Sequence, residues 1–260
     1  MRVISLASGS SGNCTVVTGE NGHLLIDAGI SMTRIKKSLA SLEINIEDIS
    51  GVLVTHEHSD HISGLTMLLK HFQLPVFAPR TVAQSICQTV AGAKNSLRVI
   101  PVGDDFDVGG FCVRAFHTSH DTEESVGYRI EGGGVFGFAT DTGCVTEEIL
   151  NGLLGADTVV IESNHDEEML KNGHYPYFLK RRVLSKNGHL SNRDCAVLAR
   201  VLEENGTTVI ALGHLSRDNN IPQLALDTVK GELCGKAQVC VLPRSEMLEL
   251  EVGGCRECLV

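Results

Sequence analysis

The sequence of 260 residues contains no tryptophan, and its aromatic side chains are limited to eight phenylalanines and three tyrosines. So few aromatic residues argue against a broad surface of stacking platforms for single-stranded nucleic acid. Basic residues are also in deficit, because 22 Lys and Arg stand against 32 Asp and Glu and give a formal net charge of −10. This balance argues against a protein that holds nucleic acid along a broadly basic surface, although it leaves room for a local cationic site.

Long hydrophobic runs are missing as well. No uncharged apolar stretch reaches the roughly 18 residues that span a bilayer, so we expect no membrane segment. The first residues carry one basic side chain and a short apolar run, a pattern that does not fit a secretory signal peptide. Nine cysteines are too few for a disulfide scaffold. We therefore expect a soluble, cytoplasmic protein with reduced thiols.

Strand-like and helix-like segments alternate along the chain without a linker or a low-complexity break. Apolar runs bounded by turn residues predict strands at residues 2–6, 14–17, 24–26, 52–55, 111–116, 126–130, 135–139, 158–161, 209–212, 238–242 and 247–252. Helical spacing predicts helices at residues 31–41, 61–72, 81–90, 145–153, 176–184, 192–203 and 222–233. Two sheets packed face to face with helices outside are the simplest arrangement of such segments. We expect a single α/β domain over residues 1–260.

Four potential metal ligands crowd one short segment that follows a predicted buried strand. They are His56, His58, Asp60 and His61. Three imidazoles beside carboxylates are costly to desolvate unless something neutralises and organises them. Neutral imidazole and carboxylate bind Zn, Mn or Fe, so the cluster predicts a metal site, with a solvated polar loop as the alternative. Asp60 and His61 fall at the start of the next predicted helix, where they can face a second ion.

The spacing His56-x-His58-x-Asp60-His61 resembles the signature of the metallo-β-lactamase fold hydrolases. The sequence LIDAG at residues 25–29 is similar to an early element of that family, in which Asp27 would support the metal loop without binding metal. The resemblance covers nearly the whole chain and implies a four-layer αββα sandwich.

The same resemblance implies three further ligands and two divalent metal ions, Zn, Mn or Fe. A histidine is required after a strand, and His117 and His120 both qualify, with His120 the better fit and His117 more consistent with a partly buried structural residue. Asp141 fits the bridging carboxylate, and His214 fits the last ligand. One ion would then be held by His56, His58 and His120, and the other by Asp60, His61 and His214, with Asp141 between them.

The second half of the chain resembles the phosphodiesterase branch of the fold. In that branch a Glu at a strand end pairs with a His that precedes the last metal ligand, and Glu162 and His189 occupy these places. The implied catalytic residues are His189, Glu162 and Asp60, with His189 protonating the departing oxygen while Glu162 orients its ring. A surface-loop histidine is the alternative for His189.

The chain is most similar to the YycJ/WalJ-type metallohydrolases, a bacterial group associated with 5′-to-3′ exonuclease action on DNA. The similar segments lie at residues 8–14, 55–61, 161–166, 188–192 and 213–220. This resemblance implies a metal-dependent phosphodiesterase that acts on nucleic acid, with DNA ends as the expected substrate. A hydrolase of small acyl substrates, such as a lactone or a thioester, is the alternative, since such enzymes share the ligand core but do not need the Glu162–His189 pair. A metal-stabilised binding module is a third, non-enzymatic possibility.

Several polar and basic residues are candidates for contacts with a phosphate. They are Ser10, Ser11 and Asn13, the basic cluster Lys180, Arg181 and Arg182, and Ser216, Arg217, Asn219 and Asn220. The first group equally fits a tight turn, and the basic cluster equally fits a solvated helix face. Cys255 and Cys258 form one C-x-x-C pair, which supplies only two zinc ligands and is more consistent with a frayed tail.

Overall fold

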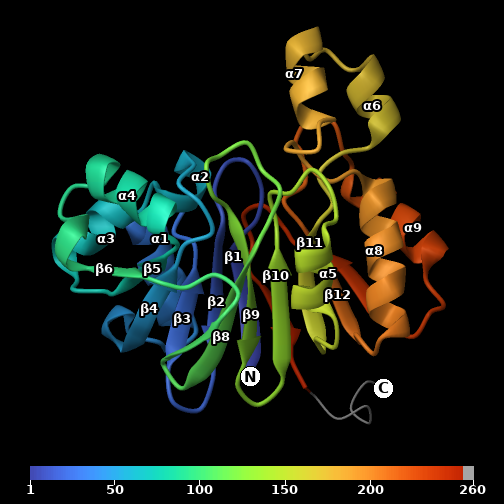
Figure 1. Ribbon diagram of the computed structural model, residues 1–260. Coiled ribbons are helices and arrows are strands. Elements are labelled where there is room, and N and C mark those ends of the chain that lie inside the picture. Colours follow the sequence, from blue (N-terminus) through green and yellow to red (C-terminus); the bar gives the residue numbers. More distant parts are fainter. Residues whose placement is uncertain (254–260) are drawn as a thin grey trace.

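The computed structural model describes residues 1–253 and arranges them around two seven-stranded sheets that face each other (Figure 1). In the first sheet the strand order is β14-β1-β2-β3-β4-β5-β6. Its strands are β14 (Leu248–Glu251), β1 (Arg2–Ala7), β2 (Cys14–Thr18), β3 (His23–Ile26), β4 (Ile49–Leu53), β5 (Val76–Ala78) and β6 (Leu97–Val99).

The second sheet has the strand order β13-β12-β11-β10-β9-β8-β7. Its strands are β13 (Gln238–Val241), β12 (Val209–Gly213), β11 (Thr158–Glu162), β10 (Val135–Ala139), β9 (Val126–Glu131), β8 (Phe111–His117) and β7 (Asp105–Val108). Strands β3 to β6 run parallel to one another in the first sheet, as do β10 to β13 in the second.

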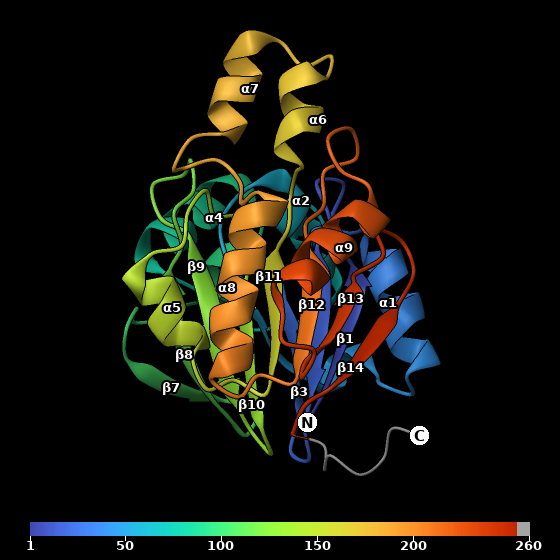
Figure 2. The same ribbon diagram turned by 90° about the vertical axis from the view of Figure 1, so that its right-hand side faces the viewer.

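Helices cover the outer face of each sheet (Figures 1 and 2). Those on the first sheet are α1 (Met32–Ser41), α3 (Leu65–His71) and α4 (Arg80–Thr89), and those on the second are α5 (Glu147–Leu153), α8 (Asn192–Glu204) and α9 (Pro222–Glu232). The short helix α2 (Ser59–Ile62) follows β4, and 3-10 turns span Ile46–Asp48 and Ala93–Asn95. Helices α6 (Glu167–Asn172) and α7 (Tyr177–Val183) project beyond the ends of the strands.

Three hydrophobic cores hold these layers together. Strand β3 contributes to two of them. Leu24 and Ile26 pack into the core between the sheets, whereas Leu25 packs into the core under α1 and α3. A third core joins the second sheet to α5, α8 and α9. Alternate side chains of one strand therefore face two different apolar layers, and such strands read as continuous hydrophobic runs. The α/β class and the four αββα layers predicted from the sequence are confirmed.

The sequence prediction differs from the structure at a few elements. The single helix predicted over residues 61–72 is wrong, because the chain breaks at Gly64 and forms α2 and α3. A Cβ at Gly64 would lie 2.2 Å from the carbonyl oxygen of Ile30, so the chain packs too tightly here for a larger residue. The strand predicted over residues 52–55 is β4 and ends at Leu53. The prediction missed β5, β6, β7 and α6.

Within residues 1–253, no helix is both long and apolar enough to cross a membrane. Cys255 and Cys258, the C-x-x-C pair noted in the sequence, lie outside the described residues.

Candidate metal centre

The predicted site residues meet at the carboxyl ends of the central strands of both sheets. The His-rich segment follows β4, Asp141 follows β10 and His214 follows β12 directly. Among residues 1–253, four non-glycine residues have a left-handed backbone, and three of them are Asp27 (φ 59°), Asp141 (φ 56°) and His214 (φ 53°). Such conformations cost about 1–3 kcal/mol each and collect at functional sites. The backbone is therefore strained where the two sheets bring these side chains together.

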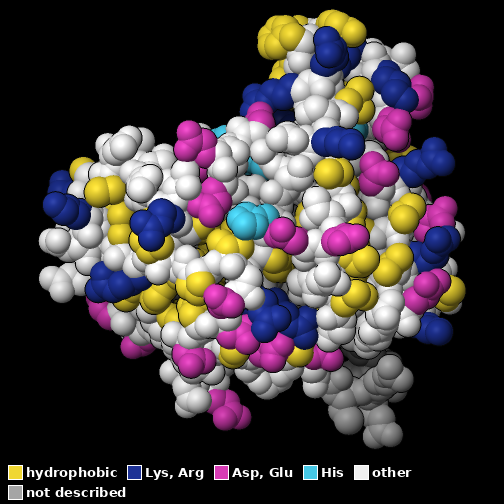
Figure 3. Space-filling view, in the orientation of Figure 1, with side chains coloured by type: hydrophobic (Ala, Val, Ile, Leu, Met, Phe, Trp, Pro, Cys, Tyr) yellow, Lys and Arg dark blue, Asp and Glu magenta, His cyan; other side chains and the backbone are white. Residues whose placement is uncertain are grey.

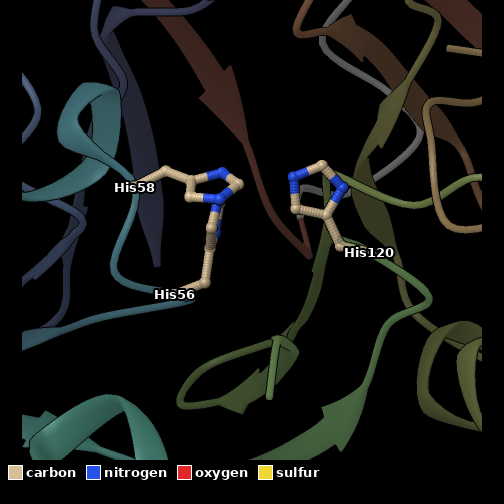
Figure 4. A group of neighbouring side chains, drawn as sticks. All are labelled: His56, His58 and His120. Carbon is tan, nitrogen blue, oxygen red and sulfur yellow. The ribbon is translucent and has the colours of Figure 1, made fainter. Parts of the chain in front are cut away.

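His56, His58 and His120 form the first group of potential ligands. One nitrogen from each ring lies within 4.8 Å of the other two. Figure 4 shows the three rings turned toward one another, with His56 and His58 from one segment and His120 opposite them. His56 is completely buried, whereas the side chain of His58 is one-third exposed. The group is thus open to solvent on the His58 side.

Asp60, His61 and His214 form the second group, again with ligand atoms within 4.8 Å of one another. The Oδ2 atom of Asp60 lies 3.5 Å from Nε2 of His61 and 3.6 Å from Nε2 of His214. Asp141 stands between the two groups, because its Oδ2 lies 3.4 Å from Nε2 of His61 and its Oδ1 lies 3.8 Å from Nε2 of His120. The structure brings together all seven residues that the sequence predicts as ligands.

Outer partners hold these rings by one nitrogen and leave the other facing the centre. His61 donates from Nδ1 to Asp27 at 2.7 Å, and Asp27 also accepts from the backbone N–H and the hydroxyl of Thr55. His120 donates from Nδ1 to the carbonyl of Gly188 at 3.1 Å. His214 donates from Nδ1 to Glu162 at 2.8 Å. Outer hydrogen bonds of this kind orient metal-binding histidines and fix their tautomer.

The atoms left facing the centre suit a divalent cation. Nε2 of His56, Nε2 of His214 and Oδ2 of Asp141 are buried and have no hydrogen-bond partner. Buried polar atoms without partners are costly, and these three are of the kind that bind metals such as Zn and Mn. The donor set of imidazoles and carboxylates therefore fits divalent metal ions.

The electrostatics of the site indicate that it is short of positive charge. Burial lowers the pKa of His61, but Asp27 and Asp141 outweigh burial and raise the pKa to about 10. A bound cation can take the place of the proton that these carboxylates hold on the ring. In contrast, burial and the neighbouring imidazoles hold the pKa of His56 well below its ordinary value. His56 is therefore neutral at pH 7, which is the form that binds a metal.

Glu162 and His189 lie beside the ligand groups and contact each other. The Oε1 atom of the fully buried Glu162 accepts from Nδ1 of His189 at 2.8 Å. Burial opposes the charged forms of both groups, but each stabilises the other, so the pKa of Glu162 is lowered and that of His189 is raised. The His189 side chain is 21% exposed, so its ring is held at the edge of the site with access to solvent.

The sequence did not predict the second contact of Glu162. The same Oε1 atom accepts from His214, so one carboxylate orients both His189 and a potential ligand. Asp121 was also missed: its Oδ1 lies 3.3 Å from Nε2 of His120 and 4.0 Å from Nε2 of His58, and its other oxygen accepts from Arg182. The place of Asp121 next to His120 was the only sequence signal for this role.

The candidate phosphate-binding residues divide into exposed and internal ones. Ser10 and Ser11 are exposed. Asn13 is buried and accepts from the backbone N–H of Gly9, and its Nδ2 lies 3.4 Å from Oδ2 of Asp60 and 3.1 Å from Nε2 of His61. Asn220 donates to the carbonyls of residues 163 and 164, so it stabilises the fold and does not face a substrate. Ser216 accepts from the backbone N–H of residues 218 and 219 within a turn. Asn219 is buried, and Arg217 is exposed.

His117, the competing candidate for a ligand, lies away from the centre. Its side chain is 49% exposed, and its Nδ1 pairs with Glu148 at 2.9 Å. The prediction that it is partly buried is wrong, because the side chain leaves the end of β8 on the solvent side, toward α5.

Comparisons with known proteins agree with this geometry. A family model described as "Beta-lactamase superfamily domain" matches residues 23–214. Exodeoxyribonuclease YycJ of Bacillus anthracis is 40% identical over 222 residues, which are 85% of this chain and 84% of that protein. Exodeoxyribonuclease WalJ of Streptococcus pneumoniae is 37% identical over 233 residues, which are 88% and 86% of the two chains.

A solved structure extends the comparison to the fold. The metallo-beta-lactamase fold protein YhfI of Bacillus subtilis has a TM-score of 0.70 and 14% sequence identity, and the match covers 95% of this chain and 99% of that one. At this identity the likeness concerns the fold alone. It identifies the four-layer sandwich as the metallo-β-lactamase type, as the sequence motifs predict.

Proposed function

The chain belongs to the beta-lactamase superfamily, and from this premise we propose that it is a metal-dependent phosphodiesterase that degrades DNA from its ends in the 5′-to-3′ direction. The two relatives above, both named exodeoxyribonucleases, support the nuclease activity because each match covers most of both chains.

The Glu162–His189 pair is the observation that carries the proposal. A hydrolase of small acyl substrates needs the metal ligands but has no need of a second, carboxylate-oriented histidine at the mouth of the site. Cleavage of a phosphodiester releases an alkoxide, which a positioned acid must protonate. His189 can be this acid. Glu162 accepts from its Nδ1 at 2.8 Å, which leaves Nε2 free to protonate the departing oxygen.

The metal-binding part of the proposal assigns two divalent ions, Zn, Mn or Fe. His56, His58 and His120 would hold one ion, Asp60, His61 and His214 would hold the other, and Asp141 would contribute to both. Bound divalent cations supply Lewis acidity and a nucleophile at neutral pH. Asp60 has a further role as a negative charge in the second group. Burial opposes its ionisation, but the imidazoles of His214 and His61, whose Nε2 atoms lie 3.6 and 3.5 Å from its Oδ2, keep its pKa well below the ordinary range.

Glu162 and His189 position the proton that the leaving oxygen needs. His189 carries a proton on Nδ1 that Glu162 holds in place, and the raised pKa of His189 means that Nε2 is also protonated in a larger fraction of molecules than in a free imidazole. Donation from Nε2 leaves a neutral ring whose tautomer Glu162 fixes. Solvent can then reprotonate Nε2 of His189, because this side chain is 21% exposed.

The proposal is tested with the variant His189→Ala. We expect a loss of DNA hydrolysis of about 10²-fold or more, which is the usual contribution of a general acid, with the metal content unchanged. The matched control is His117→Ala, which removes an exposed histidine outside the site and should leave both activity and metal content as they are. Loss of metal in His189→Ala would show that His189 is a ligand and would overturn the role given to it.

The substrate is tested with linear duplex DNA, closed circular DNA, RNA and a thioester, each with and without a chelator. We expect only linear DNA to be consumed, and only without the chelator. Hydrolysis of the thioester alone would favour the acyl hydrolase, and equal degradation of circles would contradict attack at ends.

We also propose that the enzyme acts in the cytoplasm. Within residues 1–253 all seven cysteines are free thiols, which suits a reducing compartment, and its proposed DNA substrate suits the same location.

A further inference from the structure

The helix α7 exposes two neighbouring aromatic side chains. Tyr177 is 76% exposed and Phe178 is 74% exposed, and within residues 1–253 they are the only aromatic residues among the exposed large hydrophobic ones. Of the residues of α7, only Val183 is buried. In Figure 3 hydrophobic side chains lie beside Lys and Arg at the top of the molecule, where Figure 1 places α7. These two side chains therefore do not contribute to a hydrophobic core of the fold.

The same segment is basic although the chain as a whole is acidic. Residues 167–187 contain five Lys and Arg against two Glu, whereas the chain has a formal net charge of −10. Among residues 1–253 no carboxylate pairs with Lys180, Arg181 or Lys186. The guanidinium of Arg181 lies over the Tyr177 ring, 5.9 Å from its centroid. Basic side chains without a carboxylate partner thus lie in the same segment as the exposed aromatic rings.

This surface is joined to the metal centre through the foot of α7. Arg182 donates to Asp121, the carboxylate that faces His120 and His58. The backbone N–H of His189 donates to the carbonyl of Val183 at 3.0 Å, and the next stretch of chain supplies Gly188, whose carbonyl holds His120. The C-terminal end of α7 is therefore bonded to residues that surround the metal centre.

We propose that helices α6 and α7 with the following loop, residues 167–187, form an arm that binds a single-stranded part of the DNA substrate. This inference rests on the proposed function and names how its substrate is held. Unpaired bases stack on Tyr177 and Phe178, and Lys180, Arg181 and Lys186 bind the adjacent phosphates. Aromatic stacking combined with cations that follow the backbone is how proteins hold single strands without reading their sequence.

A protein partner or a second copy of the chain fits this surface less well. A stable protein interface buries about 800 Å² on each partner, whereas two aromatic side chains provide at most about 500 Å². The unpaired cations around them would also be desolvated without compensation in a contact between two identical arms. Single-stranded DNA fits better, because its phosphates neutralise the basic side chains and its bases stack on the two aromatic rings.

The arm is tested by measuring the binding of a short, cleavage-resistant phosphorothioate oligonucleotide to the metal-loaded protein. For the double variant Tyr177→Ala/Phe178→Ala we expect Kd to rise about tenfold or more, the loss that corresponds to one stacked base. The conservative exchange Tyr177→Phe/Phe178→Tyr should retain the wild-type Kd. Val197→Ala, which truncates an exposed side chain of α8 (47% exposed), is the matched control and should have no effect.

A fluorescent reporter tests stacking directly. The chain has no tryptophan, so Tyr177→Trp introduces a single indole at the tip of the arm. We expect its emission to be quenched by the single-stranded oligonucleotide and not by blunt duplex, in which the bases are already stacked on each other.

The outcomes separate this inference from the proposed function. If the double variant binds the oligonucleotide as tightly as wild type while wild type degrades DNA, the arm does not hold the substrate, although the nuclease proposal stands. If wild type binds the oligonucleotide more tightly than the double variant but does not degrade DNA, the nuclease proposal fails, whereas the assignment of residues 167–187 as a single-strand-binding arm is supported. Hydrolysis of bis(p-nitrophenyl) phosphate, which does not reach the arm, should be unchanged in the double variant. Conversion of a dimer to a monomer by that variant, with Kd unchanged, would instead make α7 a self-association surface and overturn the proposal.

Discussion

At the residue scale, three of the potential metal ligands, His61, His120 and His214, are oriented by a partner behind the ring. Asp27, Gly188 and Glu162 each hold one imidazole by its Nδ1 atom. The ligands that lie within six residues of each other were predictable, because their crowding after a strand needs no knowledge of the fold. The double role of Glu162 was not predictable, because His189 and His214 lie 27 and 52 residues away and meet only through the topology of the second sheet.

The variant Asp27→Asn tests the outer partners. Asparagine keeps the size of the side chain but removes the negative charge that His61 faces at 2.7 Å. We expect metal affinity to fall about 10–100-fold, which is the usual effect of losing such a partner, as measured by competition with a chelating dye. The control is Asp105→Asn, since Asp105 is half exposed and pairs with Arg114 away from the site. Unchanged affinity in Asp27→Asn would contradict the supporting role of Asp27.

The variant Glu203→Gln tests a buried carboxylate that is remote from the centre. Glu203 accepts from the backbone N–H groups of Cys234, Lys236 and Ala237 at 2.6–2.8 Å. Burial opposes its charge, but these hydrogen bonds keep its pKa below the ordinary value. A lowered pKa stabilises the folded state above the unfolded-state pKa of about 4.3, and this stabilisation is lost as the pH falls through the folded-state value.

For Glu203→Gln we therefore expect the free energy of unfolding to drop by about 1–3 kcal/mol at pH 7, measured by urea denaturation. The difference from wild type should shrink as the pH falls below about 4. A difference that stays constant with pH would show that the charge of Glu203 does not contribute.

At the scale of elements, the strands buried on both faces were the easiest to predict. Their apolar runs, such as residues 24–26 and 158–161, are continuous because both faces meet a core. The missed strands are short or polar: β6 exposes Arg98 and Val99, and β7 alternates exposed aspartates with apolar residues at the edge of the sheet. Such segments are held by pairing with a neighbour, which the local sequence does not record.

The loop after β3 provides a test at this scale. Gly29 packs against the metal loop so closely that a Cβ would lie 1.6 Å from the carbonyl oxygen of Asp60. We expect Gly29→Ala to displace α2 and to reduce both metal content and the melting temperature. The control is Gly231→Ala in α9, where a Cβ would meet nothing within 4 Å, and which should be neutral or stabilise by up to about 1 kcal/mol. Normal metal content in Gly29→Ala would contradict this close packing.

At the scale of the whole molecule, charge is distributed unevenly. The formal net charge of −10 opposes binding along a DNA groove, but residues 167–187 are basic and two divalent ions would add positive charge between the sheets. An acidic protein arranged in this way suits a polyanion that is bound over a short segment or at an end. The αββα arrangement was predictable from the alternation of elements and from the family resemblance. One domain over residues 1–260 stays a prediction.

The most direct test of the two-ion centre is a titration of metal-free protein with Mn²⁺, followed by the rate of hydrolysis of linear DNA. Because Asp141 lies between two groups of potential ligands, we predict no activity without metal and a rate that saturates at two equivalents of Mn²⁺ per chain. Saturation at one equivalent, or hydrolysis that persists in the presence of a chelator, would contradict a centre in which both groups hold an ion.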